Sequence, residues 1–145
     1  MIRINRFGRR AILGLALNLA VGPVIAQVVA VVSVKSLVTT LTKAQLTDIF
    51  LGKANHLPNG AQAVPIDQPE GSVARDEFYA NFAGKSAAQI KAYWSKVIFT
   101  GRGQPPKEVA DSLEVRNRIS KNPSAIGYIE ENMVDDSVKV VSQQF

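Results

Sequence analysis

Residues 28–33 (VVAVVS) form a nearly continuous run of β-branched side chains, and this run limits the possible folds more than any other feature. A strand with one face in water alternates apolar and polar residues, whereas a strand covered on both faces is apolar throughout. The run therefore predicts a central strand with helices on both sides of its sheet. Three other segments have the composition of strands: residues 63–67 (AVPID), 126–130 (IGYIE) and 138–142 (VKVVS).

Amphipathic segments separate these strands. Thr42 with Gln45, and Ser86 with Gln89, have the spacing of capping boxes that begin helices. Further helices are predicted after Gly71-Ser72 and Asp111. Helical spacing predicts that the following side chains are buried: Phe50, Phe78, Phe82, Trp94 and Ile98. The order β-α-β-α-α-α-β-β indicates one α/β domain of three layers, a mixed or parallel sheet flanked by helices.

Residues 1–26 have the pattern of an export signal. Four arginines and no acidic residue are followed by an apolar run from Ala11 to Ala20, and the segment ends on Val24-Ile25-Ala26. The apolar run is too short to span a membrane, which takes about 20 apolar residues. Cleavage after Ala26 is expected to leave one domain, residues 27–145, without stable membrane insertion. The Arg9-Arg10 pair leaves twin-arginine export open, although general secretion fits the surrounding residues better.

This leader changes the charge argument. The whole chain has 17 basic and 12 acidic residues, but four of the basic residues lie in the leader. The rest of the chain therefore has a formal net charge of +1, which gives little support to nucleic-acid binding. The sequence has no cysteine, so it offers neither disulfides nor thiolate metal ligands.

Residues typical of catalysis are few. His56 is the only histidine, and its turn-rich surroundings suggest a surface position. The sequence contains no G-x-S-x-G nucleophile motif, and its acidic pairs are sequence neighbours, whose side chains point apart. We therefore expect no enzyme, no metal site and no cofactor.

An anion site is the stronger hypothesis. A predicted strand ends at Asp67, and Gly71-Ser72 then begin a helix with Arg75 one turn inside it. Helix N-termini present free N–H groups, Gly71 would let a ligand approach the backbone, and Arg75 would add positive charge. The alternative is structural: Ser72 caps its own helix and Arg75 pairs with an exposed acid.

Several segments resemble the phosphate-type periplasmic binding proteins of bacterial ABC importers. The resemblance lies in residues 41–53 (LTKAQLTDIFLGK), in 64–67 (VPID) with Gly71-Ser72 and Phe78, and in 125–129 (AIGYI). Tyr93-Trp94 and residues 99–106 (FTGRGQPP) are similar to a small, single-lobe subgroup, usually named phosphate ABC transporter substrate-binding proteins. The resemblance implies one lobe of a type II periplasmic binding protein. It also implies an exported protein, periplasmic or secreted, with an ABC permease or another envelope protein as partner.

The same resemblance implies a site for phosphate or a similar oxyanion. Ser33, Lys35 and Ser36, after the first strand, are expected to face Gly71, Ser72 and Arg75, because ligands gather at the carboxyl ends of strands. Two positions depart from the family pattern, in which an arginine precedes a Ser-Gly-Thr anion loop. Asp67 stands near the position of that arginine, and Glu70 takes the position of the serine. Two carboxylates there would oppose a dianion by a few kcal/mol.

Two functions follow. In the first, the chain binds an oxyanion for an importer. In the second, it is a lobe that has lost its ligand and binds another envelope protein. The acidic substitutions favour the second hypothesis, and a domain of 119 residues has about half the length of a two-lobed binder.

Overall fold

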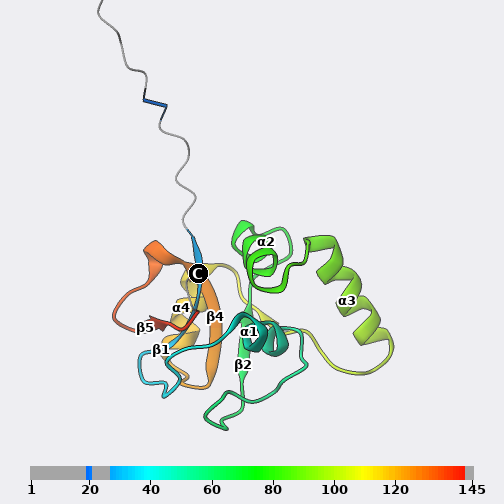
Figure 1. The fold of residues 1–145 in the computed structure, drawn as a ribbon, viewed down its shortest axis with the longest axis horizontal. Coiled ribbons are helices and arrows are strands. Elements are labelled where there is room, and N and C mark those ends of the chain that lie inside the picture. The colour runs from blue at the N-terminus through cyan, green and yellow to red at the C-terminus, as the bar shows by residue number, and fades with distance from the viewer. Residues whose placement is uncertain (1–18, 21–26, 143–145) are drawn as a thin grey trace, which may run out of the picture.

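A computed structural model describes residues 19–20 and 27–142. The predicted export signal therefore lies outside the described residues, apart from two of its positions. The described part is an α/β domain in which a mixed sheet of five strands has the order β3-β2-β4-β1-β5 (Figure 1). The fold class predicted from the sequence is confirmed.

The strands agree closely with the prediction. They are β1 (Val28–Ser33), β2 (Val64–Asp67), β3 (Lys107–Glu108), β4 (Ala125–Glu130) and β5 (Val138–Val140). The sequence did not predict β3, which has only two residues and follows a loop rich in glycine and proline. β1 is antiparallel to both of its neighbours, β4 and β5, whereas β2 is parallel to β3 and β4.

The helices are α1 (Lys43–Phe50), α2 (Val73–Phe78), α3 (Ala87–Phe99) and α4 (Ser112–Ser120), with a π-helical turn η1 (Tyr79–Ala83) after α2 and a 3-10 turn η2 (Glu131–Met133) after β4. Both predicted capping boxes are present, at Thr42–Gln45 and Ser86–Gln89. The Asp111 carboxylate caps α4 by accepting a hydrogen bond from the Glu114 N–H at 2.9 Å. These local signals hold because a cap needs only residues three positions apart.

Alternate residues of β1 face two apolar clusters, which explains the run of β-branched residues. Val28, Ala30 and Val32 pack with α1, α2 and α3, whereas Val29 and Val31 pack with α4. Helices therefore cover both faces of the sheet, as a three-layer domain requires.

Helix α4 lies very close to β4. A Cβ on Gly127 would lie 2.6 Å from Val115 Cγ1 and 2.7 Å from Ile119 Cδ1. A side chain at this position would therefore push the helix off the sheet, which explains a glycine in the middle of a buried strand.

Helix α3 lies beyond α1 and α2 on the side away from β4 (Figure 1). Its buried residues are Ile90 and Trp94. The burial predicted for Phe50, Phe78 and Trp94 is confirmed, and Phe82 is partly buried. The prediction for Ile98 was wrong, since its side chain is 49% exposed. The preceding residue, Val97, packs against the core instead, and helical spacing alone cannot decide which of two neighbouring apolar residues is covered.

Candidate functional site

The predicted anion loop begins at a buried carboxylate. Asp67, the last residue of β2, is 2% exposed. Its Oδ2 accepts a hydrogen bond from the Tyr79 hydroxyl at 2.6 Å, and its Oδ1 accepts from the Gln68 N–H at 2.8 Å and from the Tyr128 hydroxyl. Tyr79 comes from η1 and Tyr128 from β4, so the Asp67 cluster joins three elements. The carboxylate is thus satisfied within the protein.

This cluster keeps both tyrosines protonated. Burial raises the pKa of the Tyr79 and Tyr128 hydroxyls above the ordinary value, and the neighbouring Asp67 raises it further. A tyrosinate beside a buried carboxylate would place two like charges in a medium of low polarity. The two hydroxyls are therefore neutral donors at physiological pH.

Ser72 is the N-cap of α2, and both of its polar roles are filled. Its Oγ accepts from the Arg75 N–H at 3.3 Å, and its hydroxyl donates to Gln68 Oε1 at 3.2 Å. Gln68 is also buried, and its Nε2 donates to Ser112 Oγ at 3.0 Å and to the Tyr128 carbonyl at 3.1 Å. Gly71 is exposed, with a φ of 89° that favours glycine.

The Arg75 guanidinium also has partners. Its Nη1 donates to Glu108 Oε1 at 2.9 Å and to the Gln68 carbonyl at 3.1 Å, and its side chain is 12% exposed. Burial by itself would lower the pKa of Arg75, but the negative charge of Asp67 and other neighbours raises it above its ordinary value. Arg75 is therefore a fixed positive charge, neutralised mainly by Glu108 and Asp67.

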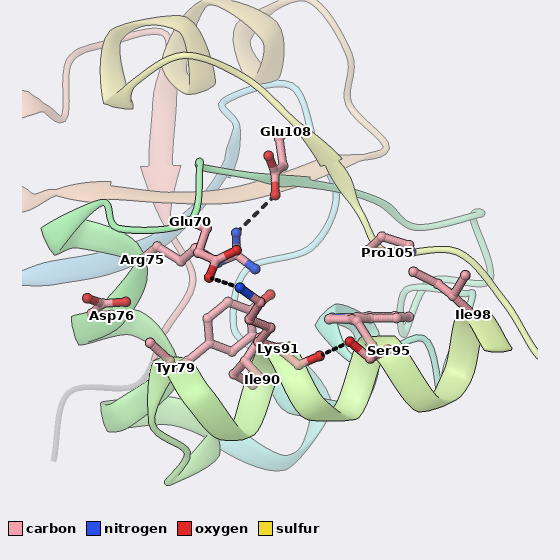
Figure 2. A pocket seen from close by; sticks show the side chains of 12 residues that line it. Glu70, Arg75, Asp76, Tyr79, Ile90, Lys91, Ser95, Ile98, Pro105 and Glu108 are labelled. Atoms are coloured by element: carbon pink, nitrogen blue, oxygen red, sulfur yellow. Dashed lines mark hydrogen bonds and ion pairs between the residues drawn. The ribbon is translucent and has the colours of Figure 1, made fainter.

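Arg75 faces a cleft of about 180 Å³ between α2 and α3 (Figure 2). Across this cleft Lys91 Nζ lies 3.2 Å from Glu70 Oε1. The charged residues of the lining are three acids, Glu70, Asp76 and Glu108, and two bases, Arg75 and Lys91. Glu70, whose carboxylate was expected to repel an anion, is thus paired with Lys91. Acids still outnumber bases in the cleft.

Ser72 lines a different hollow, where α2 and α4 begin. This hollow also contains Gln68, Asp111, Ser112 and Glu130. Glu130 Oε2 is buried and has no hydrogen-bond partner in the described part of the chain. Glu130 was not among the residues predicted for the site. The available signal was its place at the end of β4, which runs parallel to β2, so that Asp67 and Glu130 end neighbouring strands.

The structure does not bring the two predicted groups of anion ligands together. Val32 of β1 and Pro65 of β2 are both in register with Ile126 of β4, but β1 and β2 run in opposite directions. The carboxyl end of β1 therefore lies level with the amino end of β2. The expectation that Ser33, Lys35 and Ser36 face Gly71, Ser72 and Arg75 was wrong, because it assumed parallel strands.

These first-loop residues have local roles instead. Ser33 is buried, and its Oγ accepts from the Lys35 N–H at 3.2 Å. Ser36 is buried as well, and its Oγ accepts from the Val38 N–H at 3.2 Å. Lys139 Nζ donates to the Ser36 carbonyl at 2.6 Å, whereas Lys35 is exposed. The serines thus shape the turn that follows β1.

Within residues 19–20 and 27–142, no three His, Cys, Asp or Glu side chains are grouped so as to hold a metal ion. His56 is exposed, and its Nδ1 lies 2.6 Å from Asn55 Oδ1. Over the same described ranges, no helix has the length and apolar character needed to cross a membrane.

Three solved structures have the same arrangement of elements. A protein from Clostridium perfringens, assigned as a phosphate ABC transporter substrate-binding protein and solved with bound phosphate, is 25% identical with a TM-score of 0.63. The alignment covers 79% of this chain and 44% of that one. The resemblance to phosphate ABC transporter substrate-binding proteins is therefore confirmed. No protein-family model and no curated protein matches the sequence.

The other two structures show the same fold of the phosphate-type binding proteins at lower identity. An ABC-type phosphate transport receptor from Vibrio cholerae is 20% identical, with a TM-score of 0.62 over 79% of this chain and 45% of that chain. PstS from Borrelia burgdorferi is 17% identical, with a TM-score of 0.60 over 80% and 46%. The chain thus spans less than half the length of each phosphate-type relative. These structural neighbours are binding proteins rather than enzymes.

Proposed function

We propose that this chain is an exported solute-binding protein of a phosphate-type ABC importer. In this proposal it binds a phosphate-like oxyanion non-covalently at Gly71, Ser72 and Arg75, and catalyses no reaction. The observation that carries the proposal is the similarity, at 25% identity, to a phosphate-bound substrate-binding protein. The basic and then apolar leader supports export.

The local geometry leaves a route for the anion. The Glu108 carboxylate that pairs with Arg75 is 50% exposed, and a pair with one partner in water contributes only about 0–1 kcal/mol. A dianion carries more charge than Glu108 and can displace it from Arg75. Gly71 is exposed and has no side chain to block the backbone. In this binding mode Arg75 exchanges an internal partner for the ligand.

The length of the chain sets the expected affinity. It spans 44% of the phosphate-bound relative, so a ligand held by this half alone keeps water on one side. Water screens each charge and weakens each contact. We expect a dissociation constant of about 1 μM or weaker for the isolated chain, and tighter binding where a second lobe closes over the ligand.

A second candidate function is a ligand-free lobe that binds another envelope protein, such as an ABC permease. One observation favours it specifically: Ser72 and Arg75, the two side chains offered to an anion, already have internal partners. A lobe that no longer binds a ligand gains stability from such pairs and keeps its outer surface for a protein partner.

Calorimetry with phosphate and with sulfate separates the two candidates. If the anion binds at Arg75, Arg75→Ala should weaken binding about tenfold or more, and Glu108→Gln should strengthen it a few-fold by releasing the guanidinium. Glu70→Gln should also strengthen binding by removing a nearby negative charge. Arg118→Ala is the matched control, since Arg118 pairs with Glu114 on α4, away from Arg75.

Absence of binding at millimolar phosphate and sulfate in all four variants and in the unaltered protein would exclude the solute-binding function and leave the protein-binding lobe. Export has its own test. The mass of the protein isolated from its native cells should correspond to a chain that begins at or close to Gln27. A protein that still carries Met1 would contradict the proposed signal.

A further inference from the structure

Besides the cleft around Arg75 and the hollow that Ser72 lines, another hollow lies between the end of α1 and the loop that follows α3. Its volume is about 620 Å³. Three basic side chains line it: Lys53 after α1, Lys96 near the end of α3, and Arg102 in the loop. Among the described residues, none that lines this cationic hollow is acidic.

The three basic residues differ from those of the cleft around Arg75. All three are exposed, and none forms an ion pair with another described residue. Like charges around one concave surface repel each other, and their fields add within it. This arrangement is unfavourable in the free protein and becomes favourable when an anion enters.

Two aromatic side chains form part of the wall of the hollow. Tyr93 and Trp94 pack edge to face with ring centroids 5.1 Å apart. The Tyr93 hydroxyl donates to the Leu51 carbonyl at 2.6 Å, which ties α3 to the end of α1. Trp94 is 6% exposed, and its Nε1 is buried with no hydrogen-bond partner in the described part of the chain. Val97 adds an aliphatic side chain to the lining.

We propose that this hollow binds a small organic anion, one that carries phosphate or carboxylate groups on a planar apolar body. The charged groups contact Lys53, Lys96 and Arg102, and the planar body packs against Tyr93 and Trp94. A bare inorganic anion would use only the first set of contacts. The charged groups of this site differ from those of the proposed oxyanion site, because Arg75 does not line this hollow, although Trp94 lines both.

The chain supplies its own probe, since Trp94 is its only tryptophan. Titration of the purified protein with phenyl phosphate should change the Trp94 fluorescence in a saturable way. Benzyl alcohol has the ring without the charge, and inorganic phosphate has the charge without the ring. At this hollow, measured in Arg75→Ala so that the proposed oxyanion site does not contribute, each should bind about tenfold more weakly than phenyl phosphate, or worse. Added salt should weaken the binding of phenyl phosphate, because the three cations are exposed.

Variants locate the site. The double variant Lys96→Gln with Arg102→Gln should weaken phenyl phosphate binding about tenfold or more, and Lys53→Gln a few-fold. The matched control is Lys91→Gln on the same helix, since Lys91 lines the cleft around Arg75 instead. Trp94 also lines the cleft around Arg75, so the titration is repeated in Arg75→Ala, where the part of the fluorescence change that depends on Lys96 and Arg102 should remain. The four other side chains, those of Lys53, Lys91, Lys96 and Arg102, are exposed, whereas that of Arg75 is 12% exposed, and circular dichroism checks that each variant folds.

Two results would overturn the proposal. One is the absence of any saturable change in Trp94 fluorescence with phenyl phosphate at about 10 mM, a range that detects even weak binding. The other is equal loss of binding in Lys91→Gln and in the double variant, which would show a response to net charge rather than to this hollow. Neither result bears on phosphate binding at Arg75.

Discussion

The Asp67 cluster and the cationic hollow beside α3 use their polar groups in opposite ways. In the cluster, each oxygen of the Asp67 carboxylate accepts at least one hydrogen bond, and Ser72, Gln68 and Arg75 around it are bonded to one another or to Glu108. In the hollow, three cations form no ion pair with another described residue. Polar groups that satisfy each other stabilise the fold, whereas unpaired charges on a concave surface remain available to a ligand.

The two regions also differ in packing: the surroundings of Asp67 are buried, whereas the end of α3 is partly exposed. Asp67 ends β2 and is bonded to η1 and β4, and Tyr128 of β4 stacks on Phe78 with ring centroids 4.1 Å apart. Helix α3 buries Ile90 and Trp94 but leaves Phe99 92% exposed. The interior network thus contributes to the stability of the whole domain, and the end of α3 contributes little.

The largest effect is expected from Asp67→Ala. This change leaves the buried Tyr79 and Tyr128 hydroxyls without their acceptor and opens a small cavity. We expect a loss of about 2 to 5 kcal/mol in the free energy of unfolding, measured by urea denaturation. Asp76→Ala on the exposed side of α2 is the control and should stay within about 0.5 kcal/mol. A loss below about 1 kcal/mol for Asp67→Ala would show that the network is not a main source of stability.

Alkaline pH should destabilise the domain through the same network. The pKa of Tyr79 and of Tyr128 is raised in the folded state, while an unfolded tyrosine titrates near pH 10. Above that pH the unfolded chain releases protons that the folded chain keeps. The free energy of unfolding therefore falls by up to about 1.4 kcal/mol per pH unit for each tyrosine.

Urea denaturation from about pH 8 to pH 11 measures this slope. Tyr128→Phe keeps the ring and removes one titrating hydroxyl, so it should be less stable than the unaltered protein at neutral pH and lose less stability as pH rises. An identical slope in the two proteins would contradict the assignment of the pH dependence to Tyr128.

The smallest effect is expected at the end of α3. Phe99→Ser removes a side chain that is 92% exposed, so the free energy of unfolding should change by less than about 0.5 kcal/mol. Ile90→Ala on the same helix is the matched comparison. Ile90 is 1% exposed, and its truncation should cost about 2 to 5 kcal/mol. A large loss in Phe99→Ser would show that Phe99 packs against a partner in solution.

Much of the fold could be predicted from local sequence patterns. The run at 28–33, the capping boxes at Thr42 and Ser86, and the short strand near 125–130 each depend on residues close together in the chain. Periodicity and cap chemistry act over one or two turns, so they survive in almost any tertiary context. The exposure of Ile98 could not be predicted in this way, because it depends on which side of α3 the rest of the fold covers, and Val97 packs against the core instead.

The candidate site depended on the tertiary structure. By itself the sequence determined that Ser72 begins a helix and that Arg75 lies one turn inside it. Only the fold decided that β1 runs against β2, which places Ser33 and Lys35 at the other end of the sheet from Arg75. Only the fold brought Glu108 to Arg75, 33 positions away. Strand direction and long-range pairing are set by how the whole sheet is hydrogen-bonded and covered, and no segment of a few residues contains that information.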